Sequence, residues 1–329
     1  DGVYAKIIGD LDAALTGSGL PKVVKSAELG RFTRAAAQML RANVVMYQQD
    51  ASRYATVLTD MREIIGSGLY SLRSDFAGLW TDSGEWGTES IFEINYTDSP
   101  SSRTWENPTK AGGTVFPTLI GINGYSGPEW DTGGYGFEPV EEALYNAYEG
   151  DDTRRDATIL NFAKYRQQHP EATYTPRYDD TGYFNRKYLG RADGHDKYTG
   201  NAPEMNFRNN YRVWRYAETL LIASELIVRT NGDRDEADDY LNQVRARAFG
   251  MKPGDTAFAA KRRTATLDNL LLENRLEFAL EGHRFWDLVR YGKAEEVLGS
   301  RGYTDAKKPL PIPQSEIDQA HGTLKQNPY

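Results

Sequence analysis

Apolar residues recur every three or four positions in several separate stretches of the chain, which is the period of a helix with one buried face. The predicted helices cover residues 3–15, 30–47, 54–65, 213–228 and 237–248. Gly66 and Gly68 mark the end of the first helix pair, and Asp233 is a suitable N-cap inside the second. A helix–turn–helix unit buries its apolar face only against a neighbour, so we expect the two pairs to stack as tetratricopeptide-like units.

The stretch from Asp268 to Gly292 has the same period and predicts one long core helix. Glu273, Glu277 and Glu281 stand four apart on one side of it, and arginines are interleaved with its apolar positions. Two acids on one helical face could divide the roles of general acid and general base. Charges held against a core need partners, so we interpret these acids as members of structural ion pairs.

The same stretch, ENRLEFALEGHRFWDLVRYG, resembles the C-terminal signature of the SusD/RagB family, with Asn274 and Tyr291 in place of the usual Arg and Trp. DLDAAL, GRFTRAAAQML, RYAETLLIASE and PIPQSEID resemble further family segments, in the family's order. The resemblance implies a mainly α fold of stacked helical pairs with an irregular, loop-rich lobe that carries a few short strands. It also implies an outer-membrane glycan-binding lipoprotein that partners a SusC-like TonB-dependent transporter.

The domain organisation follows from where the helical pattern stops and resumes. Residues 1–68 and 211–292 are predicted to form a helical frame, residues 69–210 an irregular lobe, and residues 293–329 a C-terminal tail packed on the frame. Within the lobe, GTESIFEINYT and ATILNFAKY are the candidate strands. We expect a single SusD-like domain that lacks the family's N-terminal part, together with the signal peptide and lipidated cysteine that members carry there.

Composition removes several function classes. The chain has 47 acidic against 39 basic residues and a net charge of -8, which is unsuited to neutralising a nucleic-acid backbone. It contains no cysteine, and its four histidines are far apart in the sequence. We therefore predict no metal site, no cofactor and no nucleic-acid partner, and membrane association only through a lipid anchor outside this sequence.

A second cluster of charges, in EGDDTRRDATI, could supply the acid pair of a glycosidase. Its residues Asp151, Asp152, Arg154, Arg155 and Asp156 are better interpreted as ion pairs that fix a turn. The sequence thus predicts a protein that is not an enzyme, although a glycan-active hydrolase stays open as an alternative.

The candidate binding residues lie between Asn95 and Tyr135, where aromatic rings occur among Gly, Pro, Ser and Asn. Binding of a sugar needs flat rings for its apolar face and polar side chains for its hydroxyl rim. The candidate rings are Trp105, Tyr125, Trp130 and Tyr135, and the candidate rim groups are Arg103, Glu106, Asn107, Asn123 and Asp131.

We expect only a subset of the four rings to be exposed, because most Trp and Tyr side chains pack beneath loops. The predicted function is capture of an oligosaccharide or polysaccharide at the cell surface and its delivery to the transporter. The main alternative is a peptide-binding uptake protein of the same family, which would present a hydrophobic cleft with free backbone groups.

Overall fold

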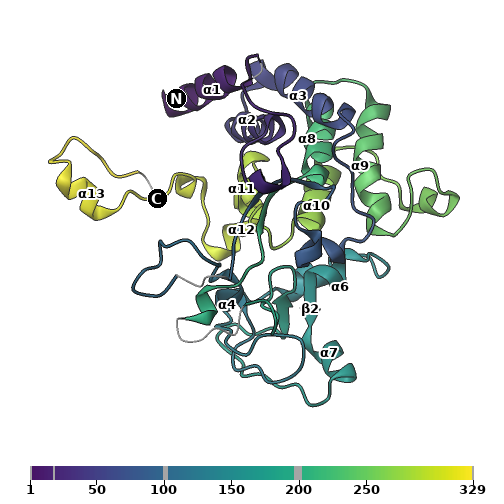
Figure 1. The fold of residues 1–329 in the computed structure, drawn as a ribbon. Helices are drawn as coiled ribbons and strands as arrows, with labels where there is room; N and C mark the ends of the chain where they lie inside the picture. Colours follow the sequence, from purple (N-terminus) through teal and green to yellow (C-terminus); the bar gives the residue numbers. More distant parts are fainter. Residues whose placement is uncertain (1, 18, 99–102, 196–201, 328–329) are drawn as a thin grey trace.

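The computed structural model describes residues 2–17, 19–98, 103–195 and 202–327, and it is mainly helical (Figure 1). The predicted stacking is confirmed, because five helices form a row in which each packs against the next. This stack consists of α1 (Gly2–Leu15), α2 (Arg34–Gln48), α3 (Tyr54–Gly66), α8 (Tyr216–Arg229) and α9 (Arg234–Ala248). Helices α2 and α3 therefore form one pair, and α8 and α9 form the other.

Local sequence signals explain where these helices begin and why they approach closely. The Thr33 hydroxyl accepts the Ala36 N–H at the start of α2, and the Asp233 carboxylate accepts two backbone N–H groups at the start of α9, as predicted. Ala36 has no exposed surface and lies in the main core with side chains from α2, α3, α8 and α9. Small side chains on α2 thus let its neighbours pack at short range.

The prediction of one long helix from Asp268 to Gly292 is wrong. The chain forms α10 (Leu267–Glu277), a turn, and then α11 (Arg284–Arg290). Leu280 and Gly282 in the turn have φ angles of 65° and 85°, which end a right-handed helix. The turn directs the Glu281 carboxylate toward Arg215 and Lys187, 2.8 and 2.6 Å away, so ion pairing overrides the continuous helical pattern.

The described residues form two short antiparallel sheets, one next to the start of α8 and one inside the lobe. Strand β1 (Ser90–Ile94) pairs with β4 (Tyr211–Arg215), and β2 (Ile159–Asn161) pairs with β3 (Tyr183–Asn185). The first candidate strand forms β1, whereas the second is strand only over the three residues of β2, because α7 (Phe162–Gln168) begins directly after it. The buried face of β1 carries Ile91 and Glu93, and the Glu93 carboxylate accepts the Asn210 amide N–H.

The lobe lies beside the helical stack, below α10 in the view of Figure 1. Its short helices are α4 (Phe116–Ile120), α5 (Glu142–Tyr145), α6 (Arg154–Thr158) and α7 (Phe162–Gln168). It has its own small core, which includes Ile122, Phe162 and Leu189. The lobe is therefore a packed unit of loops rather than a loose connection.

Buried ion pairs fasten the lobe to the frame, which confirms the structural interpretation of the acids on α10. Arg154 of the lobe contacts Glu273 and Glu277 at 2.7 and 3.0 Å, and none of the three side chains is exposed. The Arg154 guanidinium also bonds Asp152 at 2.7 Å, so the second acidic cluster is structural as well. These carboxylates and arginines neutralise one another inside the protein.

Within the described residues 293–327, the C-terminal tail packs on the frame near its start. Helix α12 (Ala294–Leu298) packs on α11, with Ala294 buried. From residue 304 onwards most side chains are exposed, and α13 (Gln314–Gln319) projects away from the helices (Figure 1). The expectation of a tail packed on the frame is thus corrected for residues 304–327, where few apolar side chains are available to bury.

Candidate functional site

Trp105 is the candidate ring that the structure presents to solvent. Its side chain is 50% exposed, and its indole N–H donates to the Glu204 carboxylate at 2.8 Å. The ring stands on a tight turn in which the Asn107 N–H donates to the carbonyl and the hydroxyl of Thr104, at 3.0 and 3.2 Å. Backbone and Thr104 hydrogen bonds in this turn lower the pKa of Glu106, which keeps that neighbouring carboxylate charged.

A buried amide holds the base of the Trp105 turn. Asn206, 2% exposed, donates to the carbonyls of Arg103 and Ala202, each at 2.9 Å, and accepts the Gly113 N–H at 3.3 Å. Gly113 is required there, because a Cβ at this position would lie 2.2 Å from the Asn206 backbone. Trp105 is therefore exposed but fixed by residues far away in the sequence.

Tyr125 and Trp130 are core residues, with exposed fractions of 3% and 1%, so the expectation that they could contribute to an exposed platform is corrected. The Tyr125 hydroxyl is hydrogen-bonded to that of Tyr165 at 3.1 Å, and burial raises the pKa of Tyr125 well above its ordinary value. The Trp130 ring is covered by the guanidinium groups of Arg186 and Arg191. Both rings stabilise the lobe from within, because its loops wrap around them.

Tyr135 is half-buried and lies beside a more exposed ring, Phe137. The two ring centroids are 5.6 Å apart, and the Arg177 guanidinium lies 5.0 Å from the Phe137 centroid while donating to the Tyr135 carbonyl at 2.6 Å. This aromatic pair and Trp105 are both anchored to α4. Thr118 in that helix accepts the Tyr135 N–H with its carbonyl and donates its hydroxyl to the Glu204 carbonyl at 2.7 Å.

The predicted rim groups divide into side chains near the Trp105 turn and side chains that support the lobe. Glu106 and Asn107 are exposed beside Trp105. The Arg103 guanidinium lies over the Tyr96 ring at 5.9 Å, close to the same turn. By contrast, the Asn123 amide donates to the Thr175 carbonyl at 2.9 Å and so supports the lobe.

Asp131 is also engaged within the lobe. Its carboxylate lies 3.1 Å from the His195 ring nitrogen and accepts the Gly133 N–H at 3.0 Å. Burial opposes ionisation, but these two hydrogen bonds prevail and lower the pKa of Asp131. The structure therefore places Asp131 in a lobe-stabilising pair rather than on the outer face with Trp105.

Sequence reasoning did not select Phe137, Arg177 or Glu204. Phe137 follows the glycines of the same loop, and that setting could have indicated an exposed ring. Glu204 carries no such signal, because it reaches Trp105 from 99 positions downstream. Only folding of the lobe brings Glu204 and Trp105 together.

The described part of the chain also limits other chemistries. It contains no group of three or more His, Asp or Glu side chains arranged to hold a metal ion. Among the same residues, no helix has the length and apolar character needed to span a bilayer.

Comparison with known protein families identifies the family of the chain, because residues 88–329 match the model of the SusD family. The chain belongs to the SusD family. Curated relatives of this SusD-family chain include SusD-like proteins P25 and P2 of Formosa agariphila, at 24% and 27% identity. The alignments cover 97% and 99% of the chain but only 62% and 64% of those proteins, so the chain spans less than two thirds of their length.

Solved structures of the family resemble the chain over its whole length. Surface glycan-binding protein A from Bacteroides thetaiotaomicron is 42% identical with a TM-score of 0.90, and the match covers all of this chain and 70% of that one. The protein of the same name from Bacteroides fluxus is 39% identical with a TM-score of 0.86, again over all of this chain and 70% of that one. The predicted SusD-like fold is thereby confirmed.

Proposed function

We propose that this SusD-family protein binds a glycan on the cell surface and releases it unchanged to a SusC-like TonB-dependent transporter. The observation that carries the proposal is Trp105, a half-exposed ring held in place by Glu204 with polar side chains around it. A fixed indole offers an apolar face to a sugar ring, and Glu106 and Asn107 can bond its hydroxyl rim. Because the ring is already positioned, little side-chain entropy is lost on binding.

The ligand class that we propose is laminarin and its oligosaccharides. The surface glycan-binding protein A of Bacteroides thetaiotaomicron is also solved in complex with laminarihexaose, and that structure has a TM-score of 0.89 to this chain at 42% identity. A laminarin-binding SusD-like protein, at 33% identity and a TM-score of 0.86, supports the same choice. The match covers 99% of this chain and 68% of that protein.

Affinity electrophoresis in gels containing laminarin, starch or no polysaccharide tests the ligand. We expect retardation in laminarin only, and loss of retardation in Trp105→Ala. Trp286→Ala is the matched control, because Trp286 is 48% exposed but lies on α11 in the frame. Equal retardation of wild type and Trp105→Ala would refute the site. Retention of peptides but of no glycan would favour the peptide-binding alternative.

The proposed protein does not cleave its ligand. The acids that the sequence places in clusters, on α10 and around Asp152, are paired with arginines or lysines, which leaves them unsuited to proton transfer. Incubation with laminarin followed by measurement of new reducing ends tests this point. Release of reducing ends above a buffer control would establish a hydrolase instead.

Delivery to a transporter is inferred from membership of the SusD family, and it is proposed for the full-length, lipid-anchored protein at the outer membrane. The test is isolation of that protein from detergent-solubilised outer membranes. We expect a SusC-like TonB-dependent transporter to co-purify with it in stable proportion. A protein that is found in another cell fraction, or that purifies without a transporter, would contradict this part of the proposal.

A further inference from the structure

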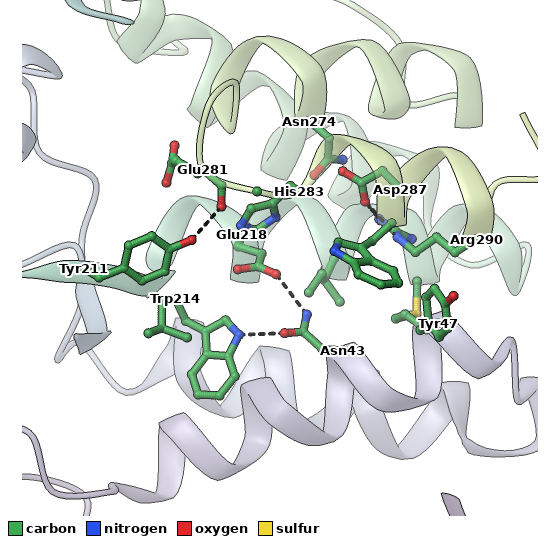
Figure 2. Close-up of a pocket in the computed structure, with 15 residues that line it drawn as sticks. Asn43, Tyr47, Tyr211, Trp214, Glu218, Asn274, Glu281, His283, Asp287 and Arg290 are labelled. Carbon is green, nitrogen blue, oxygen red and sulfur yellow. Dashed lines mark hydrogen bonds and ion pairs between the residues drawn. The ribbon is translucent and has the colours of Figure 1, made fainter. Parts of the chain in front are cut away.

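A cavity lies in the frame, away from the Trp105 site in the lobe. It has a volume of about 410 Å³ and is bounded by α2, β4, α8, α10 and α11 (Figure 2). Its walls include the rings of Tyr47, Tyr211, Trp214 and Trp286. Trp286 is 48% exposed, so the cavity reaches the surface. The volume is in the range of pockets that hold small organic groups.

Glu218, in the first turn of α8, is the polar group that this cavity leaves unsatisfied. Its side chain is 5% exposed and points into the cavity (Figure 2). Oε1 accepts the Asn43 amide N–H at 2.9 Å, whereas Oε2 is buried without a hydrogen-bond partner. A buried carboxylate oxygen without a partner is unfavourable, so a ligand that supplies a donor or a positive charge would gain free energy here.

The other charged side chains around the cavity are already neutralised by the protein. Glu281 pairs with Arg215 and Lys187, and Asp287 pairs with Arg290 at 2.9 Å. His283 faces Glu218 in Figure 2 but stacks on another ring, that of Phe278, with centroids 4.7 Å apart. Of the acids that line the cavity, Glu218 is thus the one that forms no ion pair with a Lys or Arg.

The remaining polar groups of the wall are largely used internally. Asn43 accepts the Trp214 indole N–H at 2.6 Å and donates to Glu218, so both ends of its amide are engaged. The Tyr211 hydroxyl donates to the Glu281 carbonyl at 3.0 Å. A hydroxyl-rich sugar would therefore find few partners. A single cationic head on an aliphatic stem needs only one carboxylate and aromatic or apolar walls.

We propose that this cavity binds a guanidinium or ammonium group on an aliphatic stem, with Glu218 as its counter-ion and Trp214 and Tyr211 beside it. Such a group can belong to a free small molecule or to an Arg or Lys side chain of a polypeptide. The site is independent of Trp105 and of the proposed glycan function.

The test follows the indole N–H signal of Trp214 in ¹H–¹⁵N NMR spectra of the whole chain, assigned with Trp214→Phe. That N–H is joined to Glu218 through Asn43, so a ligand at Glu218 should shift it. The probes are butylguanidinium, its neutral isostere butylurea, and the peptide acetyl-Ala-Ala-Arg-Ala-Ala-amide. We expect saturable binding of butylguanidinium and at least tenfold weaker binding of butylurea. Tighter binding of the peptide than of butylguanidinium assigns the site to a polypeptide side chain, and the reverse assigns it to a free cation.

Two variants keep the proposal testable. Glu218→Gln preserves the shape and the bond to Asn43, and it should weaken butylguanidinium binding at least tenfold. Asn274→Arg places a guanidinium in the cavity wall and should block the probe. Glu138→Gln is the control, since Glu138 is half-buried in the lobe and does not line this cavity. Equal binding of butylurea, or unchanged binding by Glu218→Gln, overturns the proposal, whereas a failure of the glycan proposal alone leaves these results unchanged.

Discussion

Arg215, the last residue of β4, lies with its Nη1 atom 2.9 Å from Oε1 of Glu277, the last residue of α10. The same nitrogen is 2.6 Å from the Glu89 carboxylate, and the other side of the guanidinium bonds Glu281. Glu277 in turn also accepts Arg154 of the lobe. One buried carboxylate therefore ties together a strand, a core helix and the lobe that carries Trp105.

Glu277→Gln should destabilise the protein by about 3–5 kcal/mol, because it removes the negative charge from arginines that stay buried. Burial by itself would raise the pKa of Glu277, but the surrounding arginines prevail and hold it far below its ordinary value, so the group is charged in the native state. Urea unfolding followed by circular dichroism at pH 7 measures the loss. Glu316→Gln, in the exposed helix α13, is the control and should change the free energy of unfolding by less than about 0.5 kcal/mol. A similar effect of both variants would mean that the network contributes no more than a surface charge.

Glu218 gives a pH dependence of the opposite sign. Burial raises its pKa above the ordinary 4.5, although the nearby His283 and the Asn43 hydrogen bond oppose the shift and Asp287 adds to it. The folded state then binds the proton more tightly than the unfolded state, so this group's contribution to stability falls as pH rises from below 4.5 through the folded pKa. Glu218→Gln cannot ionise and should lose this dependence.

The free energy of unfolding of Glu218→Gln, relative to wild type, should therefore increase between pH 4 and pH 7. Urea titrations at one-unit intervals measure this difference, and contributions from other acids cancel in it. A difference that stays constant across the range would show that Glu218 ionises in the folded protein as it does in water.

Substitution of Trp130 should reduce the stability of the protein, whereas substitution of Trp105 should reduce glycan binding. Trp130→Ala removes a buried ring and should cost about 3–5 kcal/mol in the free energy of unfolding. Trp105→Ala should change that free energy by less than about 0.5 kcal/mol and abolish retardation in laminarin gels. Thermal unfolding scans beside affinity gels measure both quantities. If Trp130→Ala stayed folded with full stability and lost laminarin binding, the buried ring rather than the exposed one would belong to the site.

The frame was predictable from the sequence because its apolar positions follow one period over whole helices, as from Arg34 to Gln48. The break in the helix after Glu277 was not predictable, because it is caused by ion pairs to residues far away in the sequence, such as Lys187. In the lobe, composition pointed to a segment rich in aromatic and polar residues but could not separate exposed Trp105 from buried Trp130. Which ring a loop covers depends on contacts such as Arg191 over Trp130, and these arise only in the folded chain.

Glu204 gives the last test, because it positions a ring that other residues leave exposed. Glu204→Ala removes the acceptor of the Trp105 indole N–H, so the ring should gain rotational freedom and lose part of its fixed orientation. We expect laminarin affinity to fall several-fold by isothermal titration calorimetry, with an unchanged unfolding midpoint. Glu204→Gln retains a carbonyl acceptor at the same place and should recover most of the affinity. If Gln were as weak as Ala, the negative charge of Glu204 would have to contact the sugar itself, and its role would be direct hydrogen bonding rather than support of Trp105.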